Sequence, residues 1–245
     1  MAKYTDTVWR ITNVDIPVRI YKEWRKTNRI SINKDKVIIR TPIIAGSMPR
    51  SYESWAKEWL SQQLMDKPEL ASRFTIRQYR TGDLVTLPYK TYTIDIISKP
   101  KKSSSAQLYG ADLIKVSLSD RLDKRQASKH TSSLLSRVIG GDLLPIVTER
   151  IQEINALYFQ ENIKSVRIKN NSSNWGSCSS NGNINISIRT LLAPLVVQDY
   201  VFIHELAHLK ELNHSARYWS IVKAAMPEYK VHERWLKEYG GKCAI

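Results

Sequence analysis

Three of the five histidines lie within eleven residues, in the segment VFIHELAHLKELNHSARYW (201–219). His204 and His208 are four residues apart, so a helix would place both imidazoles on one face, about one turn apart. Two imidazoles in this arrangement can bind one metal ion, usually zinc. Glu205 lies about 100° further round the helix, where it can reach a water on the metal rather than the metal itself. The spacing predicts a metal site with Glu205 as general base.

A catalytic zinc site normally has a third protein ligand and one position open to water. His214 is the natural third ligand, but a continuous helix would carry it about 15 Å along the axis from His204. The helix must therefore end between His208 and His214. Asn213 tolerates the left-handed conformation that closes helices, and Ser215 is a good N-cap for a following helix. We expect these residues to turn the chain so that His214 faces the same ion.

Two alternatives to this ligand set stay open. Glu228 or Glu233, on a later helix, is a rival third ligand, as in sites built from two histidines and one glutamate. The other alternative needs no metal: an amphipathic helix with two buried, hydrogen-bonded histidines and one exposed histidine. The remaining histidines, His130 and His232, are interpreted as structural or surface residues.

The elements that must position these residues fall into two parts. Residues 1–118 are rich in strand patterns, and in RISINKDKVIIRTP (29–42) alternating apolar residues around a turn signal predict a hairpin. Residues 119–245 are mainly helical. We expect an α+β protein in which the histidine helix lies beside a small sheet, preceded by a β-rich N-terminal part, with both parts forming one continuous unit.

The C-terminal part begins with a long helical pattern near Ser119. We expect an interruption at GGD (140–142) and a new helix with Pro145 in its first turn, where proline is tolerated. SVRIKN (165–170) and GNINISIR (182–189) are predicted to be two short strands, joined by a connection rich in Asn, Ser and Gly.

The charge of the chain is strongly basic. Thirty-eight Lys and Arg stand against 23 Asp and Glu, a formal net charge of +15. Such a charge can attract nucleic acid, whereas the alternative interpretation is a solvated basic surface. No helix-turn-helix, CxxC finger or RNP-like motif accompanies it. Nucleic acid is therefore a partner that the charge allows and no motif supports.

Other features of the composition narrow the class of protein. No apolar run approaches the roughly 18 residues of a membrane span, and the start MAKYTDTVWR lacks a signal pattern. Two cysteines, Cys178 and Cys243, form no disulfide framework. We expect a cytoplasmic protein without a membrane partner; the oligomeric state is left open.

The segment HELAHLKELNHSARYW (204–219) closely resembles the YgjP-like metal-dependent hydrolases, which are related to the SprT and WLM zinc metallopeptidases. The run from Asn174 to Leu209 resembles the family's W-G-S-C-S segment, strand and helix in the same order. RISINKDKVIIRTP and YRTGDLV resemble its β-rich N-terminal part. The resemblance covers most of the chain, strongly from 165 to 240 and loosely before.

This resemblance implies a zincin-like fold that binds Zn²⁺ through His204, His208 and His214, with Glu205 as the catalytic base. One residue departs from the family pattern: Asn174 stands where the family often has arginine before Trp-Gly-Ser-Cys. A substrate contact at this position is therefore in doubt.

The W-G-S-C-S segment has a functional and a structural interpretation. Trp175, Gly176 and Ser177 could line a substrate cleft with Tyr218, and the glycine would allow close approach of the backbone. The structural interpretation makes Trp175 a core residue. Cys178 is not expected to be a nucleophile, because a buried thiol without a neighbouring base is unreactive.

Two further expectations concern the substrate. Residues 183–188 are a candidate edge strand that pairs with an extended substrate backbone, as in zincin-like enzymes. Tyr218, Arg217 and Tyr200 are candidates for stabilising the oxyanion, and their proximity in sequence does not select one of them.

The leading hypothesis is a zinc-dependent metallopeptidase that hydrolyses peptide bonds by a metal-activated water with a glutamate base. One alternative is a nucleic-acid-associated protein with a structural or little-used metal site. A combination of the two hypotheses is a peptidase that acts on DNA-bound substrates. Another is a hydrolase of non-peptide amides or esters. Three nitrogen ligands favour zinc over manganese or cobalt.

Overall fold

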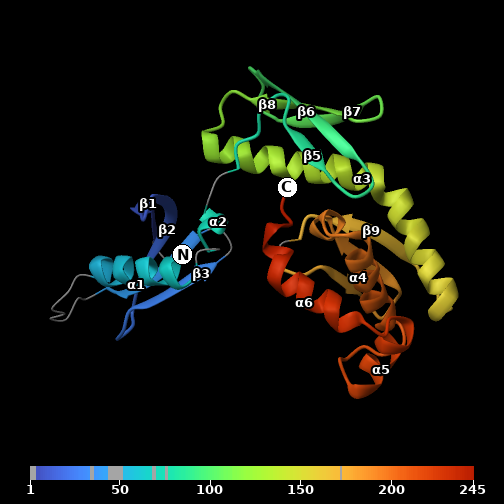
Figure 1. Ribbon diagram of the computed structural model, residues 1–245. Coiled ribbons are helices and arrows are strands. Elements are labelled where there is room, and N and C mark those ends of the chain that lie inside the picture. Colours follow the sequence, from blue (N-terminus) through green and yellow to red (C-terminus); the bar gives the residue numbers. More distant parts are fainter. Residues whose placement is uncertain (1–3, 34–35, 44–51, 68–69, 75–76, 172) are drawn as a thin grey trace. The chain divides into compact units, whose positions relative to one another are not determined.

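The computed structural model describes residues 4–33, 36–43, 52–67, 70–74, 77–171 and 173–245 (Figure 1). The chain divides into two compact units, Met1–Arg77 and Gln78–Ile245, called here the first and second units. Within the described ranges, no helix combines the length and apolar character needed to cross a lipid bilayer.

The first unit is a four-stranded sheet with two helices. Its elements are β1 (Tyr4–Ile11), β2 (Val14–Glu23), β3 (Arg29–Asn33), β4 (Lys36–Pro42), α1 (Tyr52–Asp66) and α2 (Ala71–Phe74). The strand order is β1-β2-β4-β3, with β2 and β4 parallel and the other neighbours antiparallel. The antiparallel pairing of β3 with β4 confirms the hairpin predicted for residues 29–42.

One face of this sheet forms the core of the first unit. Along β2 the alternating residues Ile16, Val18 and Ile20 are buried, and Leu60 of α1 and Phe74 of α2 belong to the same buried cluster. Because strand side chains alternate between faces, the other residues of β2 lie on the opposite face of the sheet.

The second unit begins with another four-stranded sheet, followed by one long helix. Its elements are β5 (Leu84–Thr86), β6 (Thr91–Lys99), β7 (Ser105–Tyr109), β8 (Leu113–Ser119) and α3 (Lys124–Tyr158). The strand order is β5-β6-β8-β7. Buried residues such as Ile94 and Ile114 share one core with Leu135 and Ile139 of α3, and Figure 1 shows α3 running along this sheet. The boundary expected between residues 118 and 119 therefore falls inside the second unit, because these strands pack on α3.

The predicted interruption at residues 140–142 is wrong, because α3 continues from Lys124 to Tyr158 through both glycines and Pro145. An added Cβ at Gly140 would lie 3.0 Å from Cγ2 of Ile168 in the next sheet, so this glycine allows close packing rather than a break. Burial along α3 offsets the cost of an interior proline, about 3 kcal/mol. The helix begins later than expected, with Asp123 and Gln126 forming a capping box.

The small sheet predicted beside the histidine helix is present. It contains β9 (Ser165–Lys169), β10 (Gly176–Cys178) and β11 (Asn183–Ser187), in the order β10-β11-β9. The prediction of residues 183–188 as a free edge strand is wrong, because β11 pairs with β10 on one side and with β9 on the other. The short strand β10, which sequence patterns did not reveal, is the edge strand.

Helices complete the second unit. They are α4 (Leu195–Ala207), α5 (Ala216–Ala225), α6 (Tyr229–Tyr239) and the 3-10 turns η2 (Ile188–Leu192) and η3 (Gly240–Lys242). The α+β class is confirmed, with a β-rich N-terminal part and the HExxH helix, α4, in contact with both β10 and β11.

Candidate metal centre

Helix α4 lies deep in the core of the second unit. Nine of its residues are buried, including Val197, Val201 and Leu206. Its N-terminal end has no side-chain cap from Pro194. Instead, the fully buried Gln198 donates through Nε2 to the carbonyl oxygen of Ala193 at 2.8 Å. A helix fixed in this way holds its side chains in place for chemistry.

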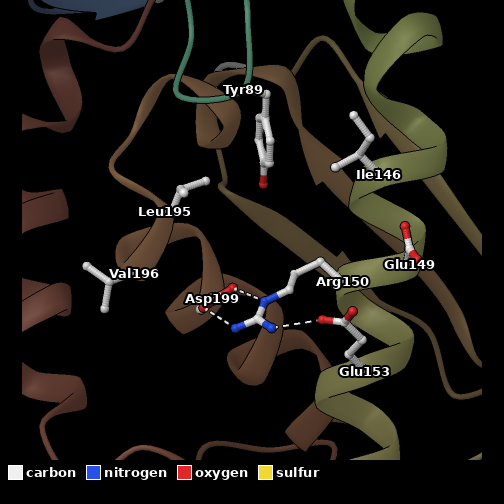
Figure 2. A pocket seen from close by; sticks show the side chains of 8 residues that line it. All are labelled: Tyr89, Ile146, Glu149, Arg150, Glu153, Leu195, Val196 and Asp199. Carbon is white, nitrogen blue, oxygen red and sulfur yellow. Dashed lines mark hydrogen bonds and ion pairs between the residues drawn. The ribbon is translucent and has the colours of Figure 1, made fainter.

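A surface hollow between α3 and α4 shows how these helices are joined (Figure 2). Arg150 of α3 donates to both carboxylate oxygens of Asp199 of α4, at 3.0 and 2.8 Å, and to Glu153 at 2.8 Å. These carboxylates raise the pKa of Arg150 above its usual value. None of the predicted site residues lines the hollow, so we assign its ion pairs a role in positioning α4.

The chain turns sharply after α4, as the spacing of the histidines required. The helix ends at Ala207, and the Ser215 hydroxyl accepts from the backbone N–H of Tyr218 at 3.3 Å as the N-cap of α5. The left-handed conformation expected for Asn213 is wrong, since its φ is not positive. The Asn213 side chain instead accepts from the backbone N–H of Ser215 at 3.0 Å, a turn that asparagine also favours.

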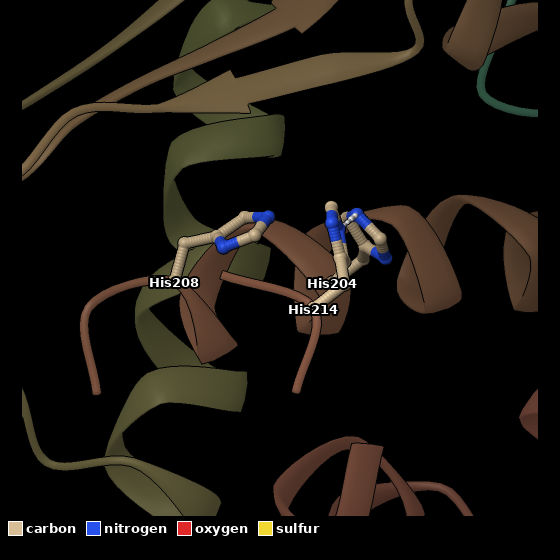
Figure 3. A group of neighbouring side chains, drawn as sticks. All are labelled: His204, His208 and His214. Carbon is tan, nitrogen blue, oxygen red and sulfur yellow. Dashed lines mark hydrogen bonds between the residues drawn. The ribbon is translucent and has the colours of Figure 1, made fainter. Parts of the chain in front are cut away.

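The turn brings the three predicted ligands together (Figure 3). One nitrogen from each of His204, His208 and His214 lies within 4.8 Å of the other two. Nε2 of His204 is 3.3 Å from Nε2 of His214. Two nitrogens bound to one zinc ion at 2.0–2.1 Å in tetrahedral geometry are separated by about 3.3 Å. The first and third ligands therefore already have the spacing that a shared zinc ion requires.

The protonation states of the imidazoles are also compatible with binding a metal cation. Burial, together with His208 and His214, lowers the pKa of His204 to about 4, and burial lowers the pKa of His208 as well. Both rings are neutral at pH 7 and can bind metal. Nδ1 of His208 lies 3.2 Å from the carbonyl oxygen of Glu211. This contact fixes a tautomer with the proton on Nδ1 and leaves Nε2 free for the ion.

The rival third ligands receive no support. Among the described residues, neither Glu228 nor Glu233 belongs to a cluster with metal-ligand spacing. The alternative without a metal predicted two buried, hydrogen-bonded histidines. His208 contacts the carbonyl oxygen of Glu211 and His204 contacts His214 through Nε2, whereas Nδ1 of His204 is buried without a hydrogen-bond partner in the part of the chain that the structure describes.

Glu205 lies beside the cluster, with only 4% of its surface exposed. Burial raises the pKa of its carboxyl group to about 8. A cation on the neighbouring histidines would favour the ionised form. The pKa of this carboxyl group therefore depends on whether a cation is bound nearby. A group of this kind is suited to accept and return a proton near neutral pH.

Tyr218 does not line a cleft, which corrects the prediction. Its side chain is fully buried and its hydroxyl donates to the backbone carbonyl oxygen of His204 at 2.9 Å. The centroid of its ring lies 4.7 Å from those of both His208 and His214. Because its hydroxyl is already used, Tyr218 is no oxyanion donor in this arrangement; it supports the imidazoles.

Strand β10 lies against α4, and Gly176 makes a close contact. A Cβ added at Gly176 would lie 2.5 Å from Oε1 of Glu205, so a larger residue here would displace the carboxyl group. Ser177 differs from the prediction: strand alternation directs its side chain away from Glu205, and Asn185 donates to its hydroxyl at 3.2 Å.

Trp175 has the structural role that was its second interpretation. The guanidinium carbon of Arg189 lies 4.3 Å from the centre of its ring, and Gly240 packs so closely that a Cβ there would lie 2.4 Å from the ring. The sequence analysis did not identify Arg189, whose side chain also donates to the carbonyl oxygens of Gly240 and Cys243. No local pattern signals contacts over such a separation in sequence.

The outer edge of β10 carries backbone groups that β11 does not use. Ser187 donates to the carbonyl oxygen of Trp175 at 2.8 Å, and Ser179 donates to Asn183 at 3.0 Å. Since hydrogen bonding alternates in antiparallel pairs, the N–H and carbonyl groups of Gly176 and Cys178 point away from β11. Asn174 covers one of them: its Nδ2 donates to the carbonyl oxygen of Gly176 at 2.8 Å.

Three further residues named in the predictions, Arg217, Tyr200 and Cys178, differ in how exposed they are. The side chain of Arg217 is 76% exposed and lies 3.9 Å from Glu211. Tyr200 is buried, with its ring centroid 6.0 Å from that of His204. Burial and the nearby Glu205 raise the pKa of Cys178 to about 11, so its thiol is protonated at pH 7 and unreactive.

Comparison with known proteins identifies the family that this chain resembles. The family model described as YgjP-like, metallopeptidase domain matches residues 26–239, more than half of the chain. A solved structure, the metallopeptidase zymogen of Pyrococcus abyssi abylysin, is 24% identical, with 38% of this chain and 94% of that chain covered. Its TM-score is 0.35, too low to support an argument about the fold. No curated protein matches the chain.

Proposed function

Since the chain belongs to the YgjP-like metallopeptidase family, we propose that its three clustered histidines bind zinc and that Glu205 is the catalytic base. The observation that carries this proposal is the cluster itself. Three ligand nitrogens lie within 4.8 Å of one another, and the carboxylate that follows the first ligand is buried beside them. Family membership makes the chain a metal-dependent peptidase; zinc and the role of Glu205 are the proposal.

The donor set favours zinc. Three neutral imidazoles are nitrogen ligands of the kind that zinc accepts in catalytic sites. Zinc bound here would act as a Lewis acid on a carbonyl group and would lower the pKa of water to roughly 7. The exposed side of His214 leaves the cluster open to solvent, from which water and substrate can enter.

Glu205 would move the proton in this reaction. Its carboxylate takes a proton from the attacking water and returns it to the leaving amine. The contact with Gly176 supports this role, since the backbone of β10 lies directly against the carboxyl group and limits its movement. The buried Tyr218 holds the backbone of His204, so the base and the ligands keep a fixed relation during proton transfer.

The substrate proposed is an extended peptide that pairs with the free edge of β10. This strand replaces the edge first expected at 183–188. The backbone groups of Gly176 and Cys178 that point away from β11 can bond an added strand, and Gly176 adjoins Glu205. A strand bound here would therefore pass the base. Backbone pairing favours peptides over other amides and over esters, which lack a regular ladder of N–H and carbonyl groups.

Asn174 would regulate access to this edge. Its side chain occupies the carbonyl oxygen of Gly176, which an incoming substrate N–H would need. A substrate strand must displace this amide before it can pair fully. Asn174, which stands where the family often has arginine before Trp-Gly-Ser-Cys, would therefore compete with the substrate for this carbonyl oxygen.

The test compares zinc-loaded wild type with Glu205→Gln on a library of quenched fluorescent peptides. We expect the wild type to cleave a subset of peptides, and the variant to lose about 10²–10⁴-fold in kcat/KM. Elemental analysis should find equal zinc in both proteins. An unchanged rate in Glu205→Gln would remove Glu205 from the mechanism. Ester hydrolysis without any peptide cleavage by the wild type would contradict the proposed substrate.

A further inference from the structure

The sheet of the first unit has one face against which, among the described residues, neither α1 nor α2 packs. Helices α1 and α2 bury their apolar residues with Val18 and Ile39 against the other face, and Figure 1 shows α1 lying along the sheet. Among the described residues on the open face, Tyr4 is 51% and Val8 61% exposed. Within the first unit taken by itself, this part of the face is therefore exposed.

Aromatic and basic side chains form one line across this face. The strand registers pair Tyr4 with Tyr21, Tyr21 with Arg40, and Arg40 with Arg29. These four residues, called here the tyrosine–arginine row, cross all four strands at one level. The two tyrosine rings are 5.6 Å apart between centroids.

Ion pairs hold arginines of this face in place over the rings. Arg19 binds both carboxylate oxygens of Asp6, at 2.7 and 2.8 Å, and its guanidinium carbon lies 4.0 Å from the ring centre of Tyr4. The guanidinium carbon of Arg40 lies 4.9 Å from the ring centre of Tyr21. Such fixed, flat surfaces are suited to stacking on planar ligands.

The charges of the row indicate an anionic partner. Arg29 and Arg40 lie directly opposite each other on neighbouring strands, an arrangement that is destabilising without a counter-charge. Arg40 has Glu23 as an ion-pair partner, whereas Arg29 is exposed and makes no ion pair with any residue that the structure describes. A phosphate between these arginines would relieve the repulsion.

The sequence adjoining the row adds to this charge. Trp24, which follows β2, is 82% exposed, and Arg25 and Lys26 come directly after it. Residues 1–77 contain 15 Lys and Arg against 8 Asp and Glu, whereas residues 78–245 contain 23 against 15. The excess of positive charge per residue is therefore about twice as high in the first unit.

We propose that the tyrosine–arginine row is the contact surface for a single-stranded nucleic acid. Its bases stack on the two tyrosines together with the guanidinium groups of Arg19 and Arg40 that lie over their rings, and its phosphates contact Arg29 and Arg40. The row favours a single strand over a duplex, because a duplex hides the faces of its bases. It favours nucleic acid over a lipid surface, because the exposed Tyr4 and the partly exposed Tyr21 lie within a row of charged groups rather than at an apolar tip.

The experiment measures binding of the full chain to fluorescein-labelled dT12 and U12 by anisotropy at several salt concentrations. We expect binding of at least one strand, with affinity falling as salt rises. The double variant Tyr4→Leu/Tyr21→Leu removes the aromatic rings but keeps apolar side chains. Since stacking contributes roughly 1–3 kcal/mol per base, we expect an affinity loss of at least about fivefold. Arg29→Ala should also reduce the slope of log K against log salt by about one.

Controls separate this surface from general basic charge. Lys67→Ala removes an exposed cation just after α1 and should leave the affinity within about twofold. Circular dichroism of each variant checks that the sheet is intact. Equal binding by the tyrosine variant and the wild type would overturn the proposal. So would a 12-bp duplex that binds as tightly as the single strands, or binding to phosphatidylserine vesicles with no binding to either oligonucleotide.

Discussion

The two units use their side chains in opposite ways. In the second unit, the reactive groups lie on or beside a buried helix, and Glu205 is 4% exposed. In the first unit, the row that includes Tyr4 and Arg29 lies on an open sheet face. A buried group has few alternative positions, so a small displacement at the metal centre should greatly reduce activity. An exposed row shares its binding free energy among several contacts, so the loss of one contact should reduce affinity only in part. The comparison predicts large effects of substitution at the metal centre and graded effects on the sheet.

The largest effect is expected for His204→Ala. Loss of a ligand should weaken zinc binding by more than the 10–100-fold that loss of a supporting hydrogen-bond partner costs, and peptide cleavage should fall below detection. Inductively coupled plasma mass spectrometry after dialysis measures the zinc. The matched control is His130→Ala, at an exposed position of α3, which should keep its zinc. Stoichiometric zinc in His204→Ala would contradict the ligand set.

A core substitution tests whether the units are independent. Leu60 is fully buried in the first unit, whose buried cluster shares no residue with that of the second unit. Leu60→Ala should destabilise the first unit by about 2–5 kcal/mol. Hydrogen exchange should therefore become faster in β1–β4 while α4 and the zinc content stay unchanged. Met65→Ala, at a residue that is 65% exposed, is the control. Faster exchange in α4 as well would show that the units are coupled.

A single methyl group tests how closely the base is held. In Gly176→Ala the new Cβ would lie 2.5 Å from Oε1 of Glu205, so the carboxyl group must move. Because small misplacements of catalytic groups cost up to about a hundredfold, we expect kcat/KM to fall about 10–100-fold with zinc retained. Gly141→Ala, where a Cβ meets nothing within 4 Å, should leave the rate unchanged. An active Gly176→Ala enzyme would mean that the position of Glu205 is not critical.

The smallest effect is expected at the edge of β10. Asn174→Ala frees the carbonyl oxygen of Gly176, and one hydrogen bond contributes about 0.5–1.5 kcal/mol. We therefore expect KM to fall about two- to tenfold with kcat nearly constant, measured on the best peptide from the library. Ser180→Ala, an exposed position after β10, should change neither constant. A rise in KM would mean that Asn174 binds the substrate instead of competing with it.

Local spacing predicted that the three histidines would come together. The interval of four between His204 and His208, and the need for a bend before His214, depend only on helix geometry and capping. Ser215 caps the next helix as expected. Asn213 stabilises the same turn through its side chain rather than through a left-handed backbone conformation. Asparagine favours both arrangements, so the sequence alone does not decide between them.

Contacts between distant residues set the limits of prediction. Gly140 is part of a continuous helix because Ile168 packs against it, so packing overrides its weak helix propensity. Strand β10 has three residues and no alternating pattern of apolar residues, and only its pairing with β11 reveals it. The buried role of Tyr218 likewise depends on the backbone of His204, fourteen residues earlier in the chain.

The bend between α4 and α5 has a consequence for how this sequence can diverge. Its side chains, such as Leu212 at 62% exposure, can be exchanged with little loss, as is usual in surface connections. Its length cannot vary in the same way, because an inserted or deleted residue would shift the third imidazole relative to the first two and misalign the Glu211 carbonyl that orients His208. Homologous chains that keep the chemistry should therefore show many substitutions but no gaps between positions 208 and 214.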